Sequence, residues 1–217
     1  MPDVQPDEHL RTEHLAGKLR DLSVRGGLSI MGVQAAQFAL GLVSTAILAR
    51  ILTPGDFGLV SMAAAVAAFL VLFLDMGLGS AIVQDAALTR EQVNTLFWIN
   101  AALGLTLAGV MAALAPLVAR FYGQPALAGV TMVLASTFVL SGLSVQHSAL
   151  LRRQMRFSAL SAIDVVSTVI GLVTVVVSGV LGAGYWALVY QQVVQQAATA
   201  GGAWLACGWR PGPPARG

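Results

Sequence analysis

The stretch ARILTPGDFGLVSMAAAVAAFLVLFLDMGLGSAIVQ, Ala49–Gln84, decides how the rest of this chain folds. It begins with the polar turn Thr53-Pro54-Gly55-Asp56, continues as an apolar run from Phe57 to Leu74, and then reaches a single carboxylate, Asp75. An apolar run of about this length crosses a bilayer as a helix, whereas a soluble protein cannot cover a helix that is apolar all round. The stretch therefore predicts a membrane hairpin.

The composition argues strongly against a water-soluble protein. Of the 217 residues, 57% are hydrophobic and only 10% are charged, and the mean hydropathy is +0.78. Soluble domains carry about 25% charged residues. The formal charge of +2 does not point to nucleic acid, because the basic residues lie at the ends of apolar runs, where they orient a membrane protein. Cys207 is the only cysteine, which excludes an intrachain disulfide and a zinc cluster built on thiolates.

The hydropathy pattern predicts an all-α, polytopic membrane helix bundle with six transmembrane helices. The predicted spans cover about 28–50, 57–83, 94–118, 125–150, 157–180 and 185–207. These spans form a transmembrane domain over residues 27–208, and the Pro/Gly-rich residues 209–217 form a tail that cannot continue a helix. Residues 1–26 form another tail, in which His9–Arg25 is either a short amphipathic helix in the headgroup layer or a solvated segment. Gly26-Gly27 marks the bend into the first span.

The distribution of basic residues predicts that both termini lie in the cytoplasm. With the N-terminus inside, the outer loops hold only Arg50 and Arg120. The inner segments hold the other ten of the twelve basic residues: Arg11, Lys18, Arg20, Arg25, Arg90, Arg152, Arg153, Arg156, Arg210 and Arg216. An excess of Lys and Arg marks the cytoplasmic side of membrane proteins.

Polar side chains inside the predicted spans suggest a hydrated cavity between the helices. Counted from the ends of their spans, five of them reach a middle layer: Gln37, Asn100, Asp164, Gln192 and Gln195. A buried charge is costly in a membrane unless it faces protein or water. The alternative is that these groups bond neighbouring helices to one another, and for the acid Asp164 a cavity role and a structural role are both open.

Other residues have simpler structural readings. Asp75, followed by Gly77 and Gly79, is interpreted as a hydrogen-bonded break or cap at the end of the second span, and Pro54 and Gly55 as its opening turn. Small residues indicate close helix packing. They lie on one face of the third span: Gly104, Ala108 and Ala112.

The strongest charge cluster, Arg152, Arg153 and Arg156, follows the fourth span. Its simplest role is to fix the topology, and its sharper interpretation is a basic rim for anionic lipid headgroups or a lipid-linked phosphate. No glycine-rich phosphate loop, metal-binding histidine pair or cysteine cluster occurs in the sequence. Gly142-Leu143-Ser144-Val145-Gln146 lacks the last glycine of a nucleophile elbow. We therefore expect no enzyme, no cofactor and no metal site.

Six blocks of the sequence, in order, carry a family resemblance. They are ARILTPGDFGLVSMA (49–63), FLDMGLGSAIVQ (73–84), LTREQVNTLFWINAALG (88–104), APLVARFYGQPAL (115–127), ALLRRQMRF (149–157) and GYWALVYQQ (184–192). Together they resemble the polysaccharide flippase branch of the multidrug/oligosaccharidyl-lipid/polysaccharide exporter superfamily, over roughly residues 20–210.

The resemblance implies a bacterial inner-membrane flippase. Such a protein moves undecaprenyl-diphosphate-linked oligosaccharide outward for exopolysaccharide or lipopolysaccharide (O-antigen) assembly, by alternating access between two six-helix lobes. This chain ends after the sixth predicted span, so it resembles the N-terminal lobe alone, and RPGPPARG (210–217) suggests a truncated or frame-shifted end. Arg152, Arg153 and Arg156 would contact the anionic lipid at the cytoplasmic mouth.

Three functions stay open at this point. The first is a flippase lobe that pairs with a second lobe or forms a homodimer, with membrane lipids and the lipid-linked oligosaccharide as partners and no nucleic acid. The second is a truncated, non-transporting membrane remnant or an assembly subunit. The third is a cation-coupled small-molecule exporter of the same superfamily, in which Asp164 would bind a proton or sodium.

Overall fold

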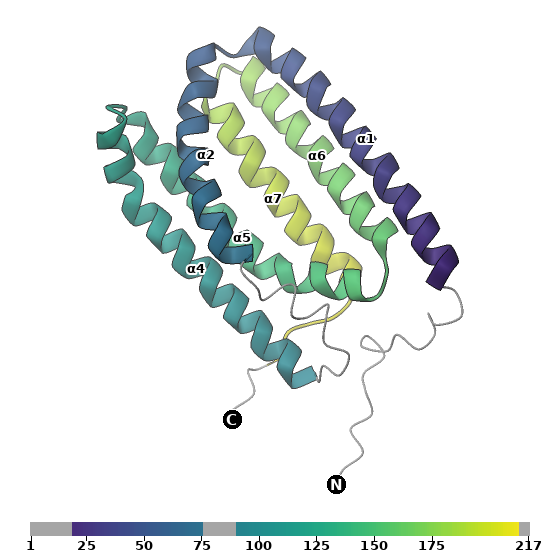
Figure 1. Ribbon diagram of the computed structural model, residues 1–217. Coiled ribbons are helices and arrows are strands. Elements are labelled where there is room, and N and C mark those ends of the chain that lie inside the picture. Colours follow the sequence, from purple (N-terminus) through teal and green to yellow (C-terminus); the bar gives the residue numbers. More distant parts are fainter. Residues whose placement is uncertain (1–18, 76–89, 213–217) are drawn as a thin grey trace.

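A computed structural model describes residues 19–75 and 90–212, which form six α-helices and contain no strand (Figure 1). The helices are α1 (Leu19–Ile51), α2 (Pro54–Asp75), α4 (Arg90–Phe121), α5 (Ala126–Arg153), α6 (Phe157–Val180) and α7 (Trp186–Cys207). Each predicted span overlaps one of these helices, and residues 76–83 of the second span lie outside the described residues. The all-α helix bundle expected from the sequence is thereby confirmed.

The first helix continues through the glycine pair that was expected to mark a bend. α1 keeps helical backbone over 33 residues, including Gly26 and Gly27. Glycine costs only about 1 kcal/mol relative to alanine in a helix, so two glycines do not end one when no proline follows. The part of the predicted amphipathic helix before Leu19 lies outside the described residues, and a domain boundary at residue 27 stays a prediction.

The polar turn after α1 is the first turn of α2. Thr53 precedes the helix and donates its backbone N–H and its hydroxyl to Asp56 Oδ2, at 2.9 and 2.7 Å. The Asp56 backbone N–H donates to Thr53 Oγ1, with the two heavy atoms 3.3 Å apart. This reciprocal pair is a capping box, and Pro54 is the first helical residue, where proline is well tolerated. Thr53–Asp56 thus starts a helix, which the sequence interpretation as a turn missed.

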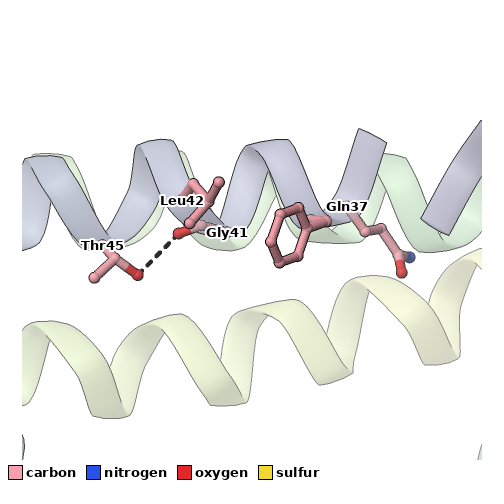
Figure 2. A pocket seen from close by; sticks show the side chains of 5 residues that line it. Gln37, Gly41, Leu42 and Thr45 are labelled. Carbon is pink, nitrogen blue, oxygen red and sulfur yellow. Dashed lines mark hydrogen bonds between the residues drawn. The ribbon is translucent and has the colours of Figure 1, made fainter. Parts of the chain in front are cut away.

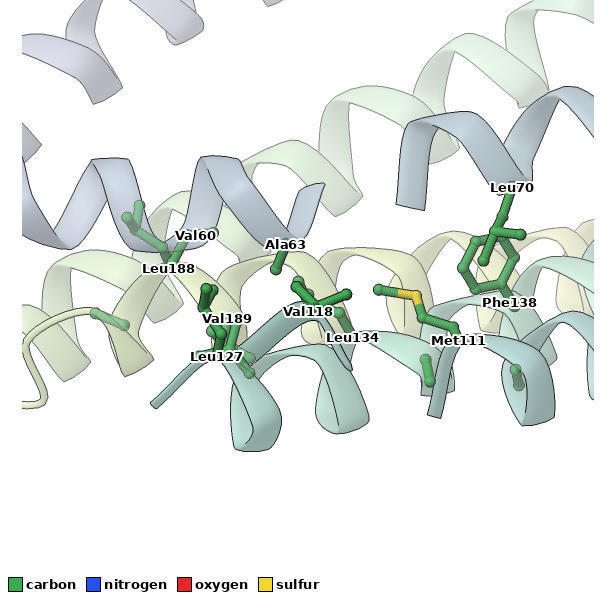
Figure 3. Packing of buried hydrophobic residues seen from close by; sticks show 14 of the residues in the cluster. Val60, Ala63, Leu70, Met111, Val118, Leu127, Leu134, Phe138, Leu188 and Val189 are labelled. Atoms are coloured by element: carbon green, nitrogen blue, oxygen red, sulfur yellow. The ribbon is translucent and has the colours of Figure 1, made fainter. Parts of the chain in front are cut away.

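Helix pairs build the bundle. α4 packs along α5, α6 packs along α7, α5 also contacts α7, and α1 lies on α6 (Figure 1). In Figure 1, α2 crosses in front of α5 and α7, and α1, α6 and α7 lie side by side. The main apolar core joins α2, α4, α5 and α7 through residues such as Val60, Met111, Phe138 and Val189 (Figure 3).

Among the described residues, four helices are long and apolar enough to cross a membrane: Pro54–Val71 of α2, Glu91–Phe121 of α4, Ala126–Arg153 of α5 and Phe157–Val180 of α6. In α1, the apolar stretch Gln37–Ile51 is shorter. α7 carries four glutamines among its 22 residues. Membrane crossing by α1 and α7, and so the full count of six spans, stays a prediction. α4 is the longest of the four, with 32 residues and Pro116 inside it.

Candidate functional site

A hydrogen bond between α6 and α7 involves one of the predicted polar residues, Gln195. Gln195 Nε2 on α7 lies 3.4 Å from Thr168 Oγ1 on α6. The Thr168 hydroxyl in turn donates to the backbone carbonyl of Asp164, one turn earlier, at 2.7 Å. Thr168 thereby links Gln195 to the helix turn that carries Asp164. Sequence reasoning did not single out Thr168.

A glycine permits the close approach of the α7 glutamines to α6. A Cβ added at Gly171 would lie 3.0 Å from Gln195 Oε1 and 3.5 Å from Gln191 Cγ. Gln195 is half-buried in this contact, whereas Gln192, three residues earlier on α7, is exposed. The two glutamines therefore differ: Gln195 packs between helices, and Gln192 is accessible.

Asp164 lies on an inner side of α6 and is nevertheless exposed. Residues seven and eleven positions further along a helix share its side, and here these are Gly171 and Val175, which are both buried. Asp164 itself is exposed. The bundle is therefore open at the Asp164 end of α6. Arg152, exposed in the last turn of α5, is the charged residue that interacts electrostatically with the Asp164 carboxylate.

Gln37 lies on the open side of α1. It lines a hollow of about 480 Å³ together with Phe38, Gly41, Leu42 and Thr45. Gln37 and Thr45 point to the same side of α1 in Figure 2, and the Thr45 hydroxyl donates to the Gly41 carbonyl at 2.9 Å. Gln37, Asp164, Gln192 and Gln195 thus lie on three neighbouring helices, with Gln37 half-buried.

Asn100 lies apart from these four residues, in the seam between α4 and α5. Its side chain is 0% exposed, and its amide atoms have no hydrogen-bond partner among the described residues. The seam is tight because two glycines meet there: a Cβ at Gly142 would lie 2.6 Å from the Asn100 carbonyl oxygen and 3.1 Å from Gly104 Cα. Gln146, one turn beyond Gly142, is equally buried and its amide also lacks a described partner.

The three arginines of the basic cluster have different surroundings. Arg156 donates from Nη1 to the Ala206 carbonyl at 2.8 Å, in the last turn of α7. A cation at a helix C-terminus is favourable because unpaired carbonyls point that way. Arg152 is exposed and Arg153 is half-buried. Arg156 is also exposed, but its guanidinium is partly occupied in holding α7.

The chain after α7 forms a C-terminal strap, Gly208–Gly212. Gly208 ends the helix in the left-handed conformation (φ 66°), and Trp209 is 4% exposed beside Phe97. Gly212 donates its N–H to Asn94 Oδ1 at 3.1 Å and accepts a bond from Trp98 Nε1 at 3.0 Å. The prediction that the chain leaves the helix here is confirmed for residues 209–212. The strap ties the end of α7 to the start of α4.

An aromatic cluster supports this strap. The His147 ring stacks on Trp204 with centroids 4.4 Å apart, and Trp204 Nε1 donates to the Leu143 carbonyl at 2.9 Å. Arg210 lies over the Trp204 ring at 5.8 Å and donates to the Trp204 carbonyl at 2.9 Å. His147 is therefore a packed aromatic residue at the strap end of the bundle.

The predicted structural residues are only partly within the described chain. Pro54 and Gly55 form the first turn of α2, and Asp75 is its last residue. Gly77 and Gly79 lie outside the described residues. The interpretation of Asp75 as a glycine-linked cap stays a prediction. Within residues 19–75 and 90–212, no three His, Cys, Asp or Glu side chains gather as a metal site requires.

Long apolar helices in one bundle, with polar side chains on α1, α6 and α7, define a multi-pass helical membrane protein. A family model described as "Polysaccharide biosynthesis protein" matches residues 47–217, and the chain belongs to this family. No solved structure matches the chain.

Relatives with assigned names come from several bacteria. The chain is 35% identical over 158 residues to the succinoglycan biosynthesis transport protein ExoT of Rhizobium meliloti, covering 72% of this chain and 32% of that protein. It is 31% identical over 128 residues to the teichuronic acid biosynthesis protein TuaB of Bacillus subtilis, covering 59% and 26%. It is 28% identical over 149 residues to the lipopolysaccharide biosynthesis protein WzxC of Escherichia coli, covering 69% and 30%. The chain thus matches between about a quarter and a third of the length of these relatives.

Proposed function

We propose that this chain forms one lobe of a flippase that carries lipid-linked oligosaccharide across the bacterial inner membrane for polysaccharide biosynthesis. The lobe works by alternating access with a second lobe, which is supplied by a longer chain, a separate chain or a second copy. Transport relatives in polysaccharide pathways support this proposal. Rocking of two helical units about a central site is a common transporter mechanism.

The observation that carries the proposal is the exposed Asp164 on an inner side of α6. An acid in a spanning helix needs water or protein partners, and Asp164 is exposed while residues on the same side of α6 are buried. We assign Gln37, Asp164, Gln192 and Gln195 to a common polar cavity, where hydroxyl-rich sugars find amide and carboxylate partners. Asn100 has no place in this cavity, because it is buried between α4 and α5.

Arg152, Arg153 and Arg156 supply positive charge for the diphosphate of the lipid carrier. Of these, Arg152 is exposed next to the Asp164 end of the cavity. Charge-assisted contacts between arginine and phosphate are among the stronger hydrogen bonds in proteins. Arg152 receives the diphosphate first, while Arg156 holds the end of α7.

The test places Arg152→Gln in the gene in its native host. Transport is measured as surface polysaccharide and as accumulation of lipid-linked oligosaccharide inside the cell. Loss of one phosphate contact is expected to lower transport roughly tenfold, with unchanged protein level. Arg50→Gln, at the other end of the bundle, is the control. Normal polysaccharide in a strain with all three arginines neutralised would remove this site assignment.

A second candidate function is a cation-coupled small-molecule exporter, because Asp164 with the Thr168 hydroxyl nearby offers oxygen ligands to a cation. In that case Asp164→Asn abolishes a sodium- or pH-dependent flux of small molecules and leaves the surface polysaccharide unchanged. Lost polysaccharide without such a flux supports the lipid-linked substrate. If neither property depends on the chain, it is a non-transporting assembly subunit.

A further inference from the structure

The link between α4 and α5 contains a hollow that the proposed transport function does not use. It has a volume of about 440 Å³, within the range of small-molecule sites. The lining residues come from the end of α4, the link and the start of α5: Pro116, Ala119, Arg120, Gly123, Pro125 and Ala128. All of them are apolar or lack a side chain except Arg120.

The backbone of the link keeps this hollow open. Gly123 adopts a left-handed conformation (φ 65°), and nothing lies within 4 Å of the position where a Cβ would be. Ala119 and Ala128, which also line the hollow, have side chains too small to fill it. The walls are therefore smooth and apolar, with a single cation at the rim.

Arg120 is the charged residue that lines the hollow. It is exposed, and no ion pair is found for it within the described ranges. The acidic residue that the described chain places at the same end is Asp56, which is bound to Thr53. A guanidinium with its five donors thus faces outward beside an apolar hollow.

Aromatic rings place the hollow at the level of the lipid headgroups. Phe121 is 81% exposed and Tyr122 38% exposed, and their rings meet edge to face at 5.0 Å. Exposed aromatic residues at the ends of spanning helices lie at the membrane–water interface. A ligand in this position meets an apolar wall on one side and the phosphate layer on the other.

We propose that this hollow binds an anionic phospholipid of the surrounding bilayer. Arg120 contacts the phosphate, and the upper part of an acyl chain lies along Pro116, Ala119 and Ala128. The lining favours this occupant, because the Arg120 guanidinium can form a charge-assisted contact with a phosphate and the remaining lining offers only apolar surface. The proposal depends on membrane insertion and is independent of what the protein transports.

Native mass spectrometry of the detergent-purified full chain tests the proposal by counting individual bound phosphatidylglycerol molecules. Arg120→Gln is expected to raise the Kd of the first bound phosphatidylglycerol about fivefold, and Ala128→Leu, which fills the hollow, acts in the same direction. Arg50→Gln is the matched control, because Arg50 is an exposed cation at the same end that does not line the hollow. Phosphatidylcholine binding is expected to be weak and equal in all variants.

Three results would overturn the site. The first is equal phosphatidylglycerol affinity in wild type and Arg120→Gln. The second is a loss of phosphatidylglycerol affinity in Arg50→Gln as large as that in Arg120→Gln. The third is no preference for phosphatidylglycerol over phosphatidylcholine. Displacement of phosphatidylglycerol from Arg120 by a polyprenyl diphosphate at a lower concentration would assign the hollow to a lipid-linked substrate instead. The transport proposal and the phospholipid proposal can fail separately. Arg152→Gln is expected to lower transport while phosphatidylglycerol still binds at Arg120.

Discussion

At the scale of single residues, the seam between α4 and α5 depends on the absence of side chains at two positions. At Gly142 a Cβ would come within 2.6 Å of the Asn100 carbonyl oxygen, and at Gly104 within 2.6 Å of the Phe138 carbonyl oxygen. Both neighbours are backbone atoms, which cannot rotate away. The small-residue face predicted on the third span is therefore a real packing surface, with Gly104 as its closest contact.

Gly142→Ala is expected to destabilise the protein by about 1–3 kcal/mol, because the two helices must separate to admit the methyl group. The measurement is thermal unfolding in detergent followed by circular dichroism. Gly109→Ala is the matched control on α4, since nothing lies within 4 Å of its Cβ position, and improved helix propensity there favours folding by up to about 1 kcal/mol. Equal melting temperatures for the two variants would contradict this account of the seam.

At the scale of elements, the capping box holds the corner between α1 and α2. Thr53→Ala removes the hydroxyl that both accepts from the Asp56 N–H and donates to the Asp56 carboxylate. The loss of an N-cap of this kind costs about 0.5–2 kcal/mol. Thr45→Ala serves as control, because the Thr45 hydroxyl bonds only within its own helix.

Hydrogen exchange read at the first turn of α2 distinguishes a local effect from a global one. Faster exchange is expected at residues 55–57 in Thr53→Ala, and exchange in α4 and α5 is expected to stay unchanged. The carboxylate of Asp56 also faces the Tyr185 backbone, and a Cβ added at Gly184 would lie 3.6 Å from Asp56 Oδ1. Some increase in exchange at the start of α7 is therefore part of the expected pattern. Unchanged exchange at residues 55–57 would show that the cap does not hold this corner.

Most element positions were predictable from the sequence. The predicted helix at 157–180 matches α6, and the predicted starts at 125 and 185 are each one residue from those of α5 and α7. Apolar length and flanking turns determine such bounds locally. The helix through Gly26-Gly27 was missed because glycine weakens a helix without ending it. The start of α2 at Pro54 was missed because a proline-glycine pair is equally typical of a turn.

The candidate site was less predictable, for a physical reason. Counting residues from the membrane surface gives depth along a helix and says nothing about which neighbour a side chain faces. Asn100 shares the predicted depth with Asp164, but it is fully buried where α4 and α5 meet at Gly104 and Gly142. The strap was missed because its bonds join residues far apart in sequence, Asn94 and Trp98 to Gly212.

At the scale of the whole molecule, the exposed residues are of two kinds, polar and apolar, and solvent exposure alone does not distinguish them. Asp164 and Gln192 are exposed, and so are Val166, Val169 and Val173 on the other side of α6. In a membrane the first class would face water and the second would face lipid. The proposed cavity therefore predicts which positions react with a water-soluble thiol reagent after substitution by cysteine.

Single cysteines in a Cys207→Ser background, probed in native membranes with a water-soluble maleimide, test this division. Gln192→Cys and Asp164→Cys are expected to react within minutes, because a thiolate forms only where water reaches. Val169→Cys and Asn100→Cys are expected to stay unmodified, the first because it faces hydrocarbon and the second because it is fully buried. Rapid labelling of Val169→Cys together with protection of Gln192→Cys would place the cavity on the wrong face.

The length of α4 has a consequence for the kind of membrane that suits this protein. No charged residue lies between Glu91 and Arg120, and this stretch is about 42 Å long at 1.5 Å per residue. The hydrocarbon layer of an ordinary bilayer is about 30 Å thick. α4 must therefore tilt or extend into both headgroup layers. A thicker bilayer would bury more of α4 without removing a charged residue from water. Changes in bilayer thickness should therefore mainly alter the tilt of α4. The strap and the Arg120 hollow would stay near opposite membrane surfaces.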